Sequence, residues 1–118
     1  MSTSATVHFM DKNNVVEAII YVHSDGYPEG LGDEIKLFLD EKVKYAPEEL
    51  RFDDPSYLAA HFVCWKLKQF GEMYDEENWD LKMIGVAPVM KDPGDIEYRY
   101  IMKCYSDTEK PTVVCQEC

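Results

Sequence analysis

The chain has 118 residues, 46% of them hydrophobic and 13% aromatic, and it carries 12 Lys and Arg against 23 Asp and Glu, for a formal net charge of −11. This length is typical of one domain with one core, and this apolar content excludes a disordered chain. The negative charge argues against direct binding of DNA or RNA, because such binding depends on clustered cationic side chains that displace counterions from phosphates.

No targeting or membrane signal is visible. No apolar run approaches the roughly 18 residues that a membrane-spanning helix needs, and the N-terminus lacks the basic and apolar regions of a signal peptide. We therefore expect a cytoplasmic protein with no membrane partner. Its four cysteines are expected to be reduced thiols.

Residues 6–10 and 15–23 predict a β-hairpin. Both runs are rich in β-branched and aromatic side chains, and the turn between them contains Asn13 and Asn14, which tolerate a positive φ angle. Three glycines and one proline fall within residues 26–32. This segment is expected to be an irregular turn that leads from the hairpin into a helix.

Two helices are predicted next. The first covers residues 33–43, where apolar side chains recur at the spacing of one buried stripe. The second covers residues 55–70, because Asp54 suits the N-cap position and Pro55 the first helical position, where no backbone N–H is needed. The side chains expected to face the core are Ile35, Phe38, Leu39 and Val43 in the first helix, and Leu58, Phe62, Val63 and Phe70 in the second.

The last third of the chain predicts strands. Residues 81–90 are apolar enough to be buried, residues 95–105 alternate between apolar and charged side chains, and residues 112–115 form a final short run. The connections between these runs are short enough for hairpins. We therefore expect a single α+β domain over residues 1–118, with a five-stranded antiparallel sheet in ββααβββ order and two helices on one face.

The turn at residues 23–32 is the first candidate binding site. It leaves a strand and enters a helix, where backbone N–H groups and short polar side chains can converge on a ligand. Arg99, on a later strand, could supply a cation. The ligand-binding candidates are His23, Asp25, Tyr27, Glu29 and Arg99. The alternative is structural: the glycines and the proline specify a tight bend that His23 and Tyr27 help to hold.

The acidic segment at residues 72–80 is the second candidate. Carboxylates surround two large aromatic side chains in a stretch that follows the second helix, which is typical of an exposed loop that contacts a protein partner. The partner-binding candidates are Tyr74, Asp75, Glu76, Glu77, Trp79 and Asp80.

Three of the four cysteines are candidate metal ligands. Cys115 and Cys118 have the two-residue spacer of a zinc half-site or a redox pair, and Cys104 could face Cys115 across a hairpin. A complete zinc site needs further ligands, and the sequence has no second C-x-x-C and no H-x-x-x-H. We predict ordinary thiols and no cofactor, and keep these three cysteines as candidate metal ligands.

No self-sufficient catalytic signature is present. The sequence has neither a G-x-S-x-G elbow nor an H-E-x-x-H motif. His61 and Cys64 would share one face of the second helix, but no third group to orient them is visible, and we interpret Cys64 as a core residue. We therefore predict a non-enzymatic protein.

Two segments, H-S-D-G-Y-P at residues 23–28 and G-D-I-E-Y at residues 94–98, resemble a group of small phage and prophage proteins. In that group an H-x-D-G-Y-P segment follows an N-terminal hairpin, and a G-D-I-E-Y segment opens a late strand. The resemblance spans nearly the whole chain and implies a viral or mobile-element origin, and with it the cytoplasm of a host cell. The group has no established activity, so no catalytic residue is carried over.

This origin and the charge lead to two main hypotheses. The first is a non-enzymatic accessory protein that binds a host protein with a basic surface, with inhibition of a defence system or of a nucleic-acid-binding factor as the resulting activity. The second is a protein that binds or sequesters a small nucleotide-like molecule through the turn at residues 23–32. An acidic structural component of a virion or replication complex is a third alternative, and both a monomer and a homodimer stay open.

Overall fold

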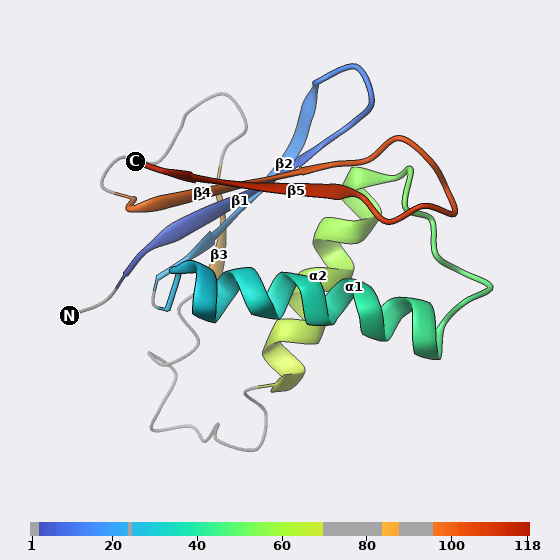
Figure 1. Cartoon of the computed structure of the whole chain (residues 1–118), viewed down its shortest axis with the longest axis horizontal. Coiled ribbons are helices and arrows are strands. Elements are labelled where there is room, and N and C mark those ends of the chain that lie inside the picture. The colour runs from blue at the N-terminus through green and yellow to red at the C-terminus, as the bar shows by residue number, and fades with distance from the viewer. Residues whose placement is uncertain (1–2, 24, 70–83, 88–95) are drawn as a thin grey trace.

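The computed structural model describes residues 3–23, 25–69, 84–87 and 96–118 (Figure 1). In these ranges it contains the strands β1 (Ala5–Met10), β2 (Val16–Val22), β3 (Ile84–Ala87), β4 (Tyr98–Lys103) and β5 (Thr112–Glu117). A short π-helical turn (Pro28–Gly32) and the helices α1 (Asp33–Tyr45) and α2 (Pro55–Gln69) lie between β2 and β3. The expected α+β class with two helices is confirmed.

The sheet is mixed, so the prediction of a fully antiparallel sheet is wrong. Its strand order is β3-β2-β1-β4-β5. The β1–β2 hairpin is antiparallel as expected, but β1 and β4 run parallel, with Ala5 opposite Tyr98 and Met10 opposite Lys103. Alternation of apolar and polar side chains indicates that a strand is half-buried, but it carries no information on the direction of the neighbouring strand.

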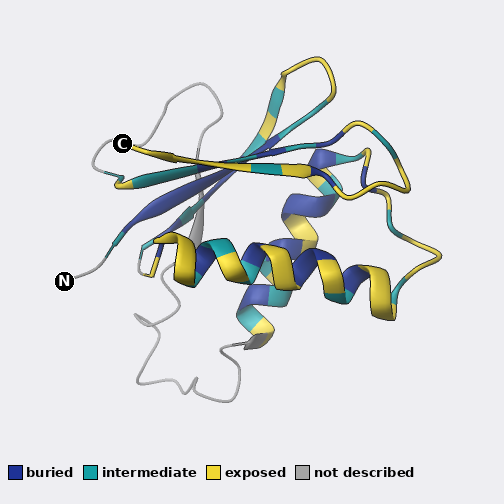
Figure 2. Cartoon of the chain, in the orientation of Figure 1, coloured by how far each residue is buried: buried dark blue, intermediate teal, exposed yellow. Residues whose placement is uncertain are grey.

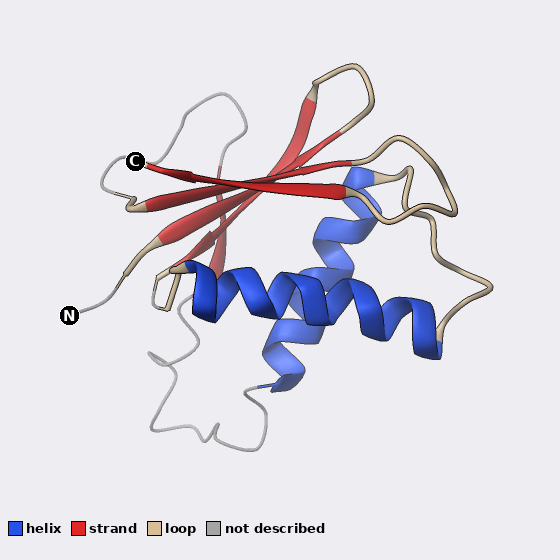
Figure 3. Cartoon of the chain, viewed as in Figure 1, coloured by secondary structure: helices blue, strands red, loops and turns tan. Residues whose placement is uncertain are grey.

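Both helices lie on the same side of the sheet, and Figure 3 shows them crossing beneath it. Phe62 of α2 lies at the centre of the interface. Its ring is 5.4 Å from that of Phe38 in α1, edge to face, and 6.1 Å from that of Phe9 in β1. The buried sides of both helices therefore face the sheet and each other, as the dark blue ribbon in Figure 2 shows.

The buried stripe of α1 differs from the predicted one at its last position. Ile35, Phe38 and Leu39 are buried as expected, but Val43 is 38% exposed and Lys42 is buried instead. The Lys42 ammonium lies 4.8 Å from the centre of the Tyr57 ring and donates to the Glu49 carbonyl oxygen at 2.9 Å. A lysine can take a core position in this way, because its aliphatic stem packs while its charged end finds an acceptor.

In α2, Leu58 and Phe62 are buried as predicted. Val63 is half-buried against the core, and Cys64 is exposed, so its interpretation as a core residue is wrong. Phe70 lies outside the described residues.

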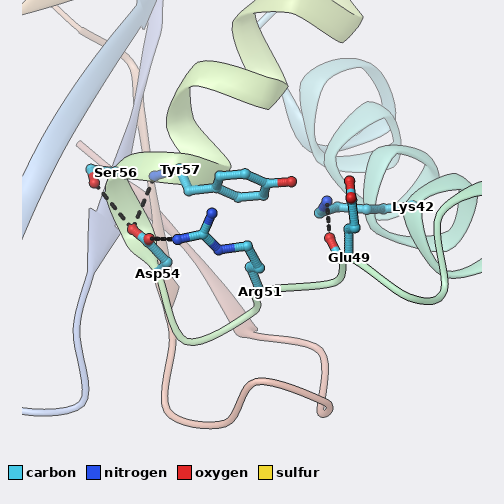
Figure 4. A network of polar contacts seen from close by, with 6 residues as sticks. All are labelled: Lys42, Glu49, Arg51, Asp54, Ser56 and Tyr57. Carbon is cyan, nitrogen blue, oxygen red and sulfur yellow. Dashed lines mark hydrogen bonds and ion pairs between the residues drawn. The ribbon is translucent and has the colours of Figure 1, made fainter.

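Asp54 caps the N-terminus of α2, as predicted (Figure 4). Its Oδ1 accepts hydrogen bonds from the Tyr57 backbone N–H and the Ser56 hydroxyl, each at 3.1 Å. Its Oδ2 lies 3.1 Å from the guanidinium of Arg51, which covers the Tyr57 ring at 4.4 Å. The cap thus joins the connection between the helices to the first turn of α2.

We expect Asp54→Ala to lower the free energy of unfolding by about 1 kcal/mol, because one of the first N–H groups of α2 loses its acceptor. Asp54→Asn should retain most of the stability, because its amide oxygen still caps the helix and the Arg51 ion pair is exposed to solvent. Urea unfolding followed by circular dichroism measures both. An equal loss in the two variants would assign the stabilisation to the ion pair.

Candidate functional site

The turn at residues 23–32 is held from beneath by Tyr100 of β4. The Tyr100 hydroxyl donates to the Gly26 carbonyl oxygen at 2.7 Å, and the Gly26 N–H donates to the Thr3 carbonyl at 2.8 Å. Burial raises the pKa of the Tyr100 phenol, so this donor keeps its proton throughout the physiological range. The buried backbone groups of the turn therefore form hydrogen bonds with β4 and with the segment that precedes β1.

Within the turn the structure brings Asp25 and Tyr27 together. The Tyr27 hydroxyl donates to Asp25 Oδ1 at 3.3 Å, and the nearby Asp25 carboxylate raises the pKa of the Tyr27 phenol. Asp25 has a φ angle of 59°, and its carbonyl oxygen accepts from the Leu31 N–H at 2.9 Å. Glu29 is exposed. This pair stabilises the bend.

The contacts described for the turn do not join His23 or Arg99 to that pair. His23 Nδ1 lies 2.9 Å from the Tyr21 hydroxyl. Arg99 is next to Tyr100 in β4, and adjacent residues of a strand point to opposite faces. Since Tyr100 points to the turn, Arg99 points to the other face of the sheet.

Gly26 and Gly32 of this turn have different surroundings. A Cβ atom at Gly26 would lie 2.6 Å from the Cβ of Ala5 and 2.8 Å from the carbonyl oxygen of Thr3. At Gly32, whose φ angle is −58°, the nearest atoms to a Cβ belong to the Tyr100 ring at 3.5 Å, an ordinary contact. Close packing therefore requires glycine at Gly26 and not at Gly32.

We expect Gly26→Ala to lower the free energy of unfolding by about 1–3 kcal/mol, the usual cost of overpacking. Gly32→Ala should leave it unchanged or raise it by up to about 1 kcal/mol, because alanine restricts the unfolded chain and meets no clash. Chemical denaturation of the two variants tests this pair. A tolerated Gly26→Ala would show that the turn is not packed against β1.

Carboxylates from distant parts of the sequence surround a hollow at the tip of the β1–β2 hairpin. This acidic hollow has a volume of about 510 Å³. Four carboxylates and one lysine are among its lining residues: Asp11, Glu17, Asp53, Asp107 and Lys12. The hollow is negatively charged as well as concave, a shape that strengthens the electrostatic field.

Cys104 also lines the acidic hollow. Burial raises the pKa of its thiol to about 12, and the carboxylates of Glu17 and Asp53 add to the effect. A thiol with this pKa stays protonated and is a poor nucleophile. The sequence does not reveal the hollow, because its carboxylates are separated by up to 96 positions, from Asp11 to Asp107, and form no motif.

A second concavity lies between α1 and α2. This helix groove has a volume of about 670 Å³. Trp65 lies in its wall and donates from Nε1 to Glu41 Oε2 at 2.6 Å, which fixes the indole ring. Aromatic, apolar and cationic side chains line the rest, among them Phe38, Lys42, Tyr45 and Lys68.

His61 and Cys64 both line the helix groove, so the expectation that they share a face of α2 is confirmed. The His61 ring stacks on Tyr57, with centroids 3.9 Å apart. Burial, followed by the charge of Lys42, lowers the pKa of His61 below its usual 6.5, so the ring is neutral at physiological pH.

The three cysteines considered as metal ligands lie apart. Cys115 is opposite Tyr100 in the β4–β5 ladder, and Cys104, which directly follows β4, is four residues beyond Tyr100, about 13 Å at the usual rise of a strand. Residues three apart in a strand, such as Cys115 and Cys118, point to opposite faces. Among the described residues no three His, Cys, Asp or Glu side chains are placed to hold a metal ion.

The acidic loop at residues 72–80, with Tyr74, Asp75, Glu76, Glu77, Trp79 and Asp80, lies outside the described residues. Comparison of the chain with protein-family models, curated proteins and solved structures gives no match. None of the described helices has the length and apolar character needed to cross a bilayer. The candidate sites therefore rest on the geometry and charge of the described residues.

Proposed function

We propose that this chain is a non-enzymatic protein that binds a basic protein partner at the acidic hollow. The observation that carries the proposal is the convergence of four carboxylates, from the hairpin, the segment before α2 and the β4–β5 connection, on one concave surface. The chain as a whole has a net charge of −11. Such a surface attracts lysine and arginine side chains and accelerates their association with it.

The chemistry around the hollow also favours binding over catalysis. Its one thiol, Cys104, is kept protonated by burial and by the surrounding carboxylates. The resemblance to small phage and prophage proteins suggests a host protein as the partner. Within this proposal, the complex blocks the basic surface of a defence protein or of a nucleic-acid-binding factor.

The first test reverses charge in the hollow. We expect Asp53→Lys with Asp107→Lys to weaken binding of a basic partner, captured by crosslinking from host cells, on the order of tenfold or more, because cations are repelled. Asp33→Lys with Asp40→Lys on the exposed side of α1 makes the same change in net charge and should bind nearly as the wild type does.

Isothermal titration calorimetry at two salt concentrations measures these affinities, and wild-type binding should weaken as salt rises. Equal binding by both double variants would refute the hollow as the contact. Failure of the wild type to capture any basic protein would refute the proposed function.

A second candidate function is the binding of a small nucleotide-like molecule, which the helix groove favours over the turn at residues 23–32. The groove combines a fixed indole ring with the cationic side chain of Lys68. Planar anions bind where an aromatic face and cations converge in a concave site. The turn at residues 23–32 instead presents the carboxylates of Asp25 and Glu29, which repel an anion.

A thermal-shift screen against nucleotides and aromatic carboxylates tests this candidate. A bound ligand at a hundredfold excess over Kd stabilises the fold by about 2.7 kcal/mol, which raises the melting temperature by several degrees. We expect the rise to be lost in Lys68→Glu and kept in Asp25→Ala. If the rise is lost only in Asp25→Ala, the ligand binds at the turn. If no ligand raises the melting temperature, this candidate function is rejected.

A further inference from the structure

Among the strands that the structure describes, β5 forms an edge of the sheet. It is last in the strand order and pairs with β4 on one side only. Figure 1 shows it in red along the edge, in front of β4. Five of its six residues are exposed, and Val114 has 54% of its surface open to solvent.

The backbone groups on the free side of β5 follow from its register. The Cys118 N–H donates to the Glu97 carbonyl at 2.9 Å, and hydrogen-bonded pairs recur at every second residue of an antiparallel ladder. Gln116 and Val114 therefore bond to β4. Val113, Cys115 and Glu117 direct their N–H and C=O groups away from the sheet, and no other described backbone group hydrogen-bonds to them.

β5 lacks the features that usually block such an edge. Between Thr112 and Glu117 there is no proline and no lysine, and the register with β4 continues without a bulge. Open edges without these features are templates for the addition of another strand. The free side of β5 can therefore form a new ladder with no change in the fold.

The charge near β5 selects among the strands that could add to it. Glu117 lies in β5. Burial, followed by the carboxylates of Glu117, Glu29 and Glu97, raises the pKa of the Tyr98 phenol in the neighbouring strand. Val113 and Val114 make the opposite end of β5 apolar. A second copy of this chain also carries a net charge of −11, and the repulsion between the two copies opposes self-pairing.

We propose that the β5 edge accepts an extended segment of the basic partner as a sixth strand, with lysine or arginine near Glu117 and β-branched side chains near Val113 and Val114. In this mode of recognition the main-chain hydrogen bonds give affinity and alternate side chains give specificity. The inference rests on the proposed function for the class of partner, but it concerns a different surface.

The test uses isotope-labelled full-length protein and a synthetic peptide with lysines in one half and valines in the other. We expect the amide hydrogens of Val113, Cys115 and Glu117 to become protected from exchange on the order of tenfold or more when the peptide binds. The amide of Val114, already bonded to β4, should change little. The same peptide with N-methyl groups on alternate residues cannot form the ladder and should produce no protection.

A matched pair of variants isolates the outward N–H of Cys115. Cys115→Pro removes it without breaking a backbone hydrogen bond to β4, and proline is tolerated at edge positions whose N–H faces solvent. Cys115→Ala removes the thiol and keeps the N–H. We expect Cys115→Ala to bind the peptide as the wild type does and Cys115→Pro to bind at least about tenfold more weakly. If Cys115→Pro does not fold, the N-methylated peptide tests the same bond.

The inference is wrong if the peptide produces no amide protection in β5, or if folded Cys115→Pro binds the peptide as the wild type does. It is also wrong if protection rises with protein concentration in the absence of peptide, because a second copy of the chain would then be the occupant. The two proposals can fail separately. Partner binding that is lost on charge reversal in the acidic hollow and kept in Cys115→Pro would retain the proposed function and reject strand addition.

Discussion

The hydrogen bond from the Tyr100 hydroxyl to the Gly26 carbonyl joins the three parts on which the rest of the structure depends. It connects β4 to the turn between β2 and α1, and the N–H of the same glycine bonds to the segment that opens β1. Because Gly26 packs against Ala5, the turn lies close to the sheet, and α1 begins where its apolar stripe can reach Phe62. The buried polar groups of the turn thus serve the fold through these hydrogen bonds.

Several cations of the described residues form ion pairs with carboxylates of the same chain. Lys66 is nearly buried in α2, and its ammonium lies 2.5 Å from Glu34 of α1. Lys110 pairs with Asp40, and Arg51 pairs with Asp54. Carboxylates outnumber these cations, so the surplus negative charge remains at the surface and gathers where loops meet. The acidic hollow is one such place, and the end of β5 near Glu117 is another.

The parallel pairing of β1 with β4 determines which surfaces are available. It places β4 and β5 on one side of β1, and β2 and β3 on the other. As a result β5 becomes an edge strand, and the β4–β5 connection comes beside the β1–β2 turn and Asp53. One feature of topology therefore creates both the open edge and the acidic hollow.

Local patterns in the sequence determined the hairpin, both helices, the Asp54 cap and the alternation of β4, because each depends on neighbours within a few residues. Tertiary structure alone decided the direction of β4 against β1, the exchange of Val43 for Lys42 in the buried stripe, and the meeting of Asp11, Glu17, Asp53 and Asp107. Periodicity records which side of an element is apolar, and not which distant element covers it. The candidate binding surfaces consist of such distant contacts, so they became visible only when the chain was folded.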